Sequence, residues 1–337
     1  MENRHQPNDL YQMRILPLSV KIRMTQSRIR AWYDYWDGNV YVSISGGKDS
    51  QVLAHIVKEM YPDIPLVFVN TGLEYDSVRL KGEELADKIL RPGMNFVEVI
   101  KRYGYPIISK EVSLYIHQVR VCEPSEKNAA VRRLRTEGIR SDGVKVKTGK
   151  IPDKWLFLLD APFKISNYCC DVMKKKPAHS YEKTSHQKPF IGTMASESEA
   201  RKKSWFKYGC NAFEKKNPSS QPLSFWRERD ILQYIKENNL KIADIYGDVI
   251  YEEDDYYTTG ADRTGCTFCL FGIAKDPERF LRLKEVEPKK YDYVMRGGCF
   301  NEQRLWEPGY DENGVFGLGY KFIINWLNEH GSLNIKY

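Results

Sequence analysis

The stretch SISGGKDSQ, residues 43–51, overlaps the end of an apolar run at residues 40–44 and holds two glycines, a lysine and an aspartate. The apolar run predicts a buried β-strand, and residues 50–60 carry the apolar spacing of an amphipathic helix. A glycine-rich turn between a strand and a helix exposes backbone N–H groups, and the start of the helix adds the positive end of its dipole. The stretch therefore predicts a phosphate-binding loop, with an ordinary glycine turn as the alternative.

The predicted loop departs from two common phosphate loops. A Walker A loop requires Gly, four further residues and Gly-Lys-Ser/Thr, whereas Gly47-Lys48 is followed by Asp49. The dinucleotide fingerprint Gly-x-Gly-x-x-Gly does not fit either. The string Ser-Gly-Gly-Lys-Asp-Ser instead resembles the PP-loop of the N-type ATP pyrophosphatases, or adenine nucleotide alpha hydrolases. The resemblance implies that pyrophosphate is held by the loop residues Ser45, Gly46, Gly47, Lys48, Asp49 and Ser50.

Strand and helix patterns alternate along the chain on both sides of the loop. This order predicts an α/β fold with a doubly wound, mainly parallel sheet and flanking helices, as in the adenine nucleotide alpha hydrolases. The expected strands are residues 40–45, 66–69, 96–100 and 189–193, and the expected helices are residues 15–36, 50–60, 76–90 and 224–238. We expect an N-terminal helical extension at residues 1–37, a nucleotide-binding domain at 38–240, and an irregular C-terminal region with Cys-x-x-Cys at 241–337.

A basic insertion interrupts the pattern at about residues 113–160. Between residues 120 and 154 the chain has ten Lys or Arg against five Asp or Glu. We expect an insertion, partly loop, that is either a solvated surface or a contact for nucleic acid or substrate. The net charge of +7 also suits an anionic ligand. No apolar run approaches the roughly 20 residues of a membrane span, and the first residues lack a signal core, so we expect a cytoplasmic protein without membrane contact.

Two further segments resemble the phosphoadenosine phosphosulfate (PAPS) reductase branch of that superfamily. Residues 70–74 (NTGLE) are similar to Asp-Thr-Gly-x-Glu, with Asn70 in place of Asp. Residues 192–201 (GTMASESEAR) are similar to Gly-x-Arg-x-x-Glu-Ser-x-x-Arg, with Met194 in place of the first Arg. The resemblance implies catalytic roles for Lys48, Asp49 and Arg201, with Mg²⁺ beside Asp49. It implies nucleotide contacts from Asn70, Thr71, Gly72, Glu74, Gly192, Glu197, Ser198 and Arg201.

Seven cysteines without an export signal favour metal ligation or reactivity over disulfides. The pair Cys169-Cys170 and the later Gly-Cys266-Thr-Phe-Cys269 resemble the arrangement in the iron–sulfur reductases for adenosine phosphosulfate (APS). That resemblance implies that Cys169, Cys170, Cys266 and Cys269 ligate a [4Fe–4S] cluster. A structural zinc is the alternative, and Cys299 could replace Cys169 as a ligand. The remaining two, Cys122 and Cys210, are interpreted as lone buried thiols.

The sulfonucleotide reductases attack their substrate with a mobile C-terminal cysteine, whereas residues 330–337 (HGSLNIKY) contain none. In this respect the chain is similar to PP-loop enzymes that adenylate an oxygen of DNA or tRNA, release pyrophosphate and let sulfur displace AMP. We therefore expect an ATP pyrophosphatase that uses Mg²⁺, DNA or tRNA as acceptor, and a sulfur-donor protein such as a cysteine desulfurase. One alternative is a reductase of PAPS or APS that uses Cys299 or a partner's thiol. The other is a non-catalytic module that binds nucleotide or nucleic acid.

Overall fold

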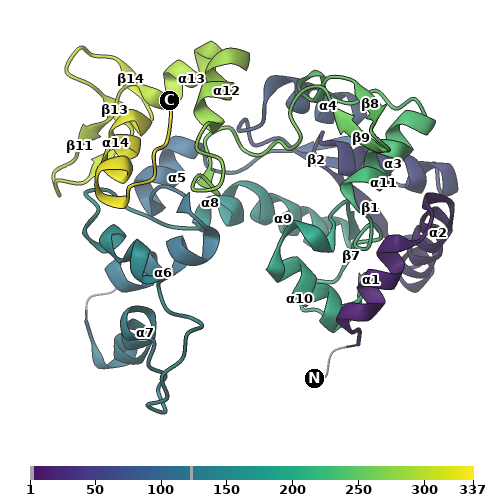
Figure 1. Ribbon diagram of the computed structural model, residues 1–337, viewed down its shortest axis with the longest axis horizontal. Coiled ribbons are helices and arrows are strands. Elements are labelled where there is room, and N and C mark those ends of the chain that lie inside the picture. The colour runs from purple at the N-terminus through teal and green to yellow at the C-terminus, as the bar shows by residue number, and fades with distance from the viewer. Residues whose placement is uncertain (1–3, 122–123) are drawn as a thin grey trace. The chain divides into compact units, whose positions relative to one another are not determined.

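The protein, in a computed structural model that describes residues 4–121 and 124–337, forms two compact units (Figure 1). The first unit comprises Met1–Arg91 and Pro177–Gly265, and the second comprises Pro92–Lys176 and Cys266–Tyr337. Each unit is therefore assembled from two separate stretches of chain. The domain boundaries expected after residues 37 and 240 come from sequence pattern alone and stay a prediction.

A six-stranded sheet in the order β3-β2-β1-β5-β7-β6 forms the centre of the first unit. Neighbouring strands run parallel, except that β6 is antiparallel to β7. Val42 of β1 pairs with Leu66 on one side and with Phe190 on the other, so the apolar first strand lies inside the sheet. The predicted α/β class and mainly parallel sheet are confirmed. The strands are β1 (Val40–Ile44), β2 (Leu66–Val69), β3 (Lys88–Leu90), β5 (Lys188–Ile191), β6 (Asn211–Ala212) and β7 (Ser219–Ser220).

Helices flank this sheet, as the alternating pattern predicts. Helix α3 (Lys48–Met60) directly follows β1 and buries Val52, Leu53 and Ile56 in the same apolar core as Phe68 of β2. In the described residues no helix is long and apolar enough to span a membrane. The other elements are α1 (Pro7–Ile15), α2 (Leu18–Tyr35), α4 (Asp76–Leu85), α9 (Lys176–Ser185), α10 (Glu199–Tyr208), α11 (Glu228–Glu237), the short turns η3 (Ala195–Glu197) and η4 (Asp244–Tyr246), and the hairpin of β8 (Val249–Glu252) and β9 (Asp255–Thr258).

The strand expected at residues 96–100 is wrong, because these residues begin helix α5 (Phe96–Tyr103). Their buried apolar side chains are three and four residues apart, which places them on one face of a helix. Asn95 caps that helix, since its side chain accepts a hydrogen bond from the backbone N–H of Glu98. The third strand along the chain is instead β3, which is formed by the last residues of the helix expected at 76–90.

The second unit combines helices with short paired strands. β4 (Ile107–Ile108) pairs in parallel with β10 (Leu270–Phe271), so the two stretches of this unit meet in one ladder. Tyr105 and Tyr320 are fully buried edge to face, and each donates its hydroxyl to a backbone carbonyl. The other elements are α6 (Lys110–Arg120), α7 (Glu126–Glu137), η1 (Asp153–Asp160), α8 (Tyr168–Cys170), η2 (Asp171–Lys175), α12 (Arg279–Val286), α13 (Pro288–Met295), β11 (Cys299–Phe300), β12 (Trp306–Glu307), β13 (Gly309–Tyr310), β14 (Phe316–Gly317) and α14 (Tyr320–Gly331).

The basic insertion expected at about residues 113–160 contains most of α6, all of α7 and η1. Several of its cations are engaged within the second unit. Arg120, Arg132 and Arg135 donate hydrogen bonds to backbone carbonyl groups. Arg133 pairs with a carboxylate on its own helix. The basic composition of this segment is therefore partly structural.

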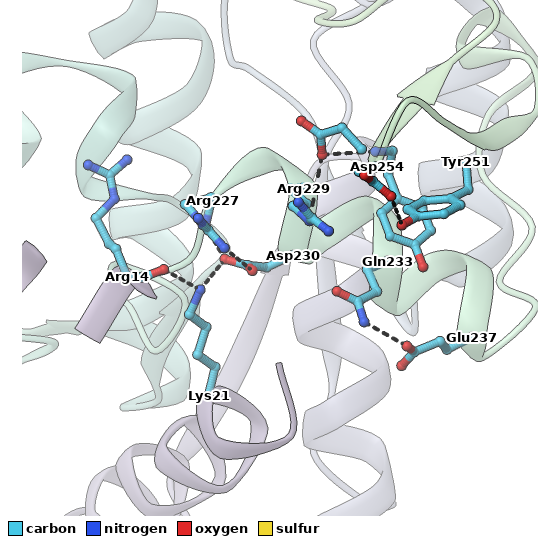
Figure 2. Close-up of polar contacts among 11 residues, drawn as sticks. Arg14, Lys21, Arg227, Arg229, Asp230, Gln233, Glu237, Tyr251 and Asp254 are labelled. Carbon is cyan, nitrogen blue, oxygen red and sulfur yellow. Dashed lines mark hydrogen bonds and ion pairs between the residues drawn. The ribbon is translucent and has the colours of Figure 1, made fainter. Parts of the chain in front are cut away.

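Helix α11 begins at Glu228, later than the sequence pattern predicts, and a buried ion pair fixes its first turn (Figure 2). Lys21 reaches from α2, and its ammonium lies 2.5 Å from Oδ2 of Asp230, with neither side chain more than 3% exposed. The same ammonium donates to the carbonyl of Arg14, and the backbone N–H of Arg227 donates to Asp230. Burial lowers the pKa of Lys21, and the Asp230 carboxylate opposes that shift. The pair thus fastens α2 to the start of α11.

Lys21→Met is expected to lower the free energy of unfolding by about 3–5 kcal/mol, because it leaves the buried Asp230 carboxylate without its counter-charge. The double variant Lys21→Met/Asp230→Asn removes both charges and should recover much of this loss. Urea unfolding curves of the two variants and the wild type measure the difference. Equal destabilisation in the single and double variants would mean that packing, and not charge, sets the cost.

Candidate functional site

The predicted phosphate loop joins the end of β1 to the start of α3. Gly46 has a φ of +73°, and a Cβ there would lie 1.9 Å from the carbonyl oxygen of Val78, so glycine is required. The hydroxyl of Ser50 accepts a hydrogen bond from the backbone N–H of Ser45, and the hydroxyl of Ser45 accepts one from Gly47. The two serines thereby hold the loop in a fixed turn at a helix N-terminus, where oxyanions bind.

The end of β5 lies directly against this loop. A Cβ at Gly192 would lie 2.9 Å from the carbonyl oxygen of Asp49 and from the Cα of Ser50, so glycine permits the contact. Met194, which stands where the family motif has an arginine, is buried in the apolar core. The motif at residues 192–201 therefore reaches the loop, but Met194, at the position of its first arginine, is a core side chain.

Glu197 gathers two guanidinium groups beside the loop. Its carboxylate pairs with Arg201 and lies 3.1 Å from Arg263, and it also accepts the backbone N–H of Met194 at 2.7 Å. Ser198 accepts the backbone N–H of Arg201 and so caps α10. Arg263 belongs to none of the sequence motifs, yet it brings a charge to the site that Met194 does not supply.

Lys48 and Asp49 occupy the first turn of α3. The buried ammonium of Lys48 lies 2.5 Å from Oε1 of Glu228, donates to the carbonyl of Asp262 and lies 4.9 Å from the ring centre of Tyr246. Side chains and backbone from α11, η4 and the segment after β9 thus converge on this lysine. One carboxylate oxygen of Asp49 is buried and has no hydrogen-bond partner among the described residues. That oxygen is therefore able to accept a cation or a donor.

The carboxyl group of Asp49 is strongly perturbed. Burial, and next the Glu228 carboxylate, raise the pKa of Asp49 from 3.8 to about 7, although Lys48 opposes the shift. Asp49 therefore keeps its proton to a higher pH than an ordinary carboxyl group. A cation bound to this carboxylate would relieve its repulsion with Glu228. Such perturbed groups are typical of functional sites.

The motif at residues 70–74 lies at the carboxyl end of β2. Because β2 is beside β1, this motif and the loop lie at the same edge of the sheet. Asn70 donates to Glu83 at 2.6 Å and accepts the backbone N–H of Gly72. Thr71 donates to the buried carboxylate of Glu74 at 2.8 Å. These side chains fix the turn after β2, and the amide of Asn70 takes part through hydrogen bonds.

A cavity of about 430 Å³ adjoins Glu197, Glu228 and Arg263, and its volume is within the range of small-molecule sites. Sequence reasoning missed Glu228, Asp262, Arg263 and Tyr246, because their contacts with the loop and with Glu197 are made only by the fold. Among them only Glu228 lies in an element that the sequence predicts, the helix expected at residues 224–238. The cavity lining includes Met194, Glu197, Glu228, Arg229, Asp262 and Arg263.

Four cysteines gather in the second unit. Cys169 and Cys170 form α8, just before the π-helical segment η2, and Cys266 and Cys269 span the turn before β10. The hydrogen bond with Cys170, then burial and the charges of the other three thiols, raise the pKa of Cys169. The same hydrogen bond, with help from Lys110 and Lys174, lowers the pKa of Cys170 to about 6, although burial opposes it. These pKa effects place the four thiols within electrostatic reach of one another.

The other cysteines lie apart from this cluster. Cys299, the alternative ligand, is in β11, where it acts on the pKa of Tyr105. Cys210 is buried in the first unit, and Cys122 lies outside the described residues. Throughout residues 4–121 and 124–337, no group of three or more His, Cys, Asp or Glu side chains is arranged to hold a metal ion. The identity of any metal group at the four thiols stays a prediction.

Asp49→Asn is expected to stabilise the protein at about pH 8, because the amide cannot ionise. The folded-state pKa lies above the unfolded value, so the cost of the carboxylate is absent below about pH 4, grows toward pH 7 and is constant above it. The gain in melting temperature should therefore be larger at about pH 8 than at about pH 5. Asp63→Asn, at an exposed position, is the matched control. A gain that is the same at both pH values would contradict the raised pKa.

Residues 39–102 and 143–270, more than half of the chain, match the phosphoadenosine phosphosulfate reductase domain. An uncharacterized protein of Methanocaldococcus jannaschii is 23% identical over 292 residues, which are 83% of this chain but only 54% of that relative. The chain thus spans about half the length of this relative. A crystal structure of phosphoadenylyl-sulfate (PAPS) reductase from Candida auris, a phosphate complex, is similar over 65% of this chain and 82% of its own, at 15% identity and a TM-score of 0.36. The chain belongs to the family of the phosphoadenosine phosphosulfate reductase domain.

Proposed function

We propose that the protein binds ATP at the loop and transfers its adenylyl group to an acceptor oxygen, which is thereby activated for replacement by sulfur. The observation that carries this proposal is Asp49, whose carboxyl has a raised pKa and a buried oxygen without a partner in the described chain. A Walker loop, which serves γ-phosphate transfer, has Ser or Thr at this position. Membership in the PAPS reductase domain family supports an adenine nucleotide as the ligand of the loop.

The pyrophosphate part of ATP would lie along residues 45–50, against the backbone N–H groups at the start of α3. Lys48 would bind it in exchange for the ion pair with Glu228, because the buried ammonium has room for few partners. Asp49 would hold Mg²⁺, which would supply charge that neutralises the phosphate groups.

The α-phosphate would be bound by guanidinium groups. Arg201 and Arg263 already meet at Glu197, and each can exchange that contact for a phosphate oxygen. Their charges are fixed before the reaction, so they stabilise the charge that develops around the α-phosphorus without reorganising. Arg263 would thereby supply the positive charge of the family's arginine, whose position Met194 occupies in this chain.

The proposed reaction has two displacements. The acceptor oxygen attacks the α-phosphorus, a new P–O bond forms, and the bond to the bridging oxygen of pyrophosphate breaks. Pyrophosphate leaves with the electron pair of that bond. A thiol reductant attacks the persulfide of a donor protein such as a cysteine desulfurase, ends in a disulfide and releases hydrosulfide. The hydrosulfide then displaces AMP, which carries the acceptor's oxygen away.

A [4Fe–4S] cluster fits the donor set of the second unit. Four thiols are the ligands that such a cluster takes, and its irons accept sulfurs that lie too far apart for one ion. The backbone N–H of Phe271 lies 3.4 Å from Sγ of Cys269, and Lys110 lowers the pKa of Cys170, so donors and positive charge surround the thiols. When bound, the cluster would supply redox chemistry or a binding place for sulfur.

Product analysis separates this function from its alternatives. With ATP, Mg²⁺ and DNA or tRNA, the protein should release pyrophosphate. Lys48→Met should slow that release about 10²-fold or more, because it removes a fixed charge from the leaving group. Lys88→Met, on the exposed strand β3, should have no effect.

Two other outcomes would replace the proposal. Sulfite released from PAPS or APS, without pyrophosphate from ATP, would identify a sulfonucleotide reductase. Nucleotide binding that yields neither product would identify a binding module.

Protein purified without oxygen should be brown and hold about four iron and four sulfide ions per chain. Cys170→Ser should lose most of the iron, because it removes one of the four gathered thiols, whereas Cys299→Ser should keep it. Elemental analysis and the visible spectrum measure both variants. A colourless wild-type protein that holds zinc would rule the cluster out.

A further inference from the structure

Helix α10 and the turn between β6 and β7 carry a dense group of cations. Between residues 199 and 216 the chain has six Lys or Arg against two Asp or Glu. One of those acids, Glu214, lies 2.5 Å from the guanidinium of Arg4 and is already neutralised. We name the lysines of this segment the α10 basic surface: Lys202, Lys203, Lys207, Lys215 and Lys216.

The lysines of this surface lie close to one another. The ammonium groups of Lys207 and Lys215 lie 5.1 and 4.8 Å from the centre of the same ring, that of Tyr208. Lys215 also donates to the hydroxyl of Ser204 at 2.8 Å, so the β6–β7 turn rests against α10. Lys203 is exposed and stands one helical turn before Lys207, on the same side of the helix. Like charges held this close repel each other, so an anionic ligand would stabilise the arrangement.

The surface begins at the nucleotide site. Arg201 lies in the first turn of α10 and pairs with Glu197 beside the loop, whereas the lysines follow further along the helix. Trp205 anchors α10, since it is buried and stacks on His5. Figure 1 shows α10 near the start of α1 in the first unit. A polyanion that lies along α10 would therefore lead to the bound α-phosphate.

We propose that the α10 basic surface binds the phosphate backbone of duplex DNA and directs it to the nucleotide site as the sulfur acceptor. The acceptor role rests on the proposed function, whereas the binding itself does not. Lysine ammonium groups contact phosphates and do not distinguish base sequence. Duplex DNA carries a denser charge than a single strand. Non-specific single-strand binding stacks bases on free aromatic rings, whereas Trp205 is buried and the ring of Tyr208 already packs against Lys207 and Lys215. Duplex RNA is recognised mainly by its groove shape and its 2′-hydroxyls, and lysines that contact only phosphates gain no preference for it.

The test compares two triple variants of equal charge. Lys203→Gln/Lys207→Gln/Lys216→Gln neutralises the α10 basic surface. Lys88→Gln/Lys236→Gln/Lys241→Gln neutralises three exposed lysines elsewhere in the first unit. Fluorescence anisotropy with labelled duplex DNA, without nucleotide and between about 50 and 200 mM salt, measures binding. The α10 variant should bind at least about tenfold more weakly, with a salt slope smaller by about one for each lysine lost, and the control should match wild type.

Two control measurements, of melting temperature and of pyrophosphate release, accompany the binding experiment. Melting temperatures of both variants should equal that of the wild type, because the exchanged side chains lie at the surface. Pyrophosphate release from ATP without DNA should be unchanged in the α10 variant, so a failure of the proposed function is seen separately from a failure to bind DNA. Equal losses in both variants, preference for duplex RNA or for a single strand, or no DNA binding at the lowest salt would each overturn the inference.

Discussion

The acidic side of the nucleotide site depends on where α11 begins, and the buried pair of Lys21 and Asp230 fixes that point (Figure 2). Asp230 also accepts the backbone N–H of Arg227, so the first turn of α11 cannot shift without leaving a charge buried and unpaired. Glu228, two residues before Asp230, is thereby held 2.5 Å from Lys48. An ion pair between α2 and α11 thus sets the charge distribution at the phosphate loop.

That distribution is costly for the folded chain, and a cation bound at Asp49 would relieve the cost. Asp49 and Glu228 repel each other while burial weakens the hydration of the Asp49 carboxylate. Lys48 is bound to a carboxylate and a backbone carbonyl, contacts that a phosphate can take over. Functional sites often keep groups that lower stability, because the same groups bind substrate or a metal ion. The loop belongs to this kind of site by its geometry as well as by its motif.

The local sequence pattern was sufficient to predict the loop, but it was insufficient to predict the residues around the loop. Gly46 is demanded by a positive φ and a close approach, so the glycine-rich motif was a reliable signal. The run at residues 96–100 is too short for periodicity to separate strand from helix, and only the Asn95 cap favours the helix. The contacts of Glu228 with Lys48 and of Arg263 with Glu197 could not be found from sequence, because the fold makes them across long stretches of chain. Composition singled out the insertion, whereas the exposed lysines Lys203 and Lys216 lie on α10 and in the β6–β7 turn.

The position of the cut in ATP decides whether the loop holds a leaving pyrophosphate. The protein is mixed with Mg²⁺ and with ATP at a lower concentration than the protein, in water enriched in heavy oxygen. Even slow attack by water then yields measurable products. Phosphorus NMR and mass spectrometry then locate the broken bond and the label. Attack at the α-phosphorus predicts AMP that carries the heavy oxygen and unlabelled pyrophosphate. ADP with labelled inorganic phosphate would contradict it, because the loop would then serve γ-phosphate transfer.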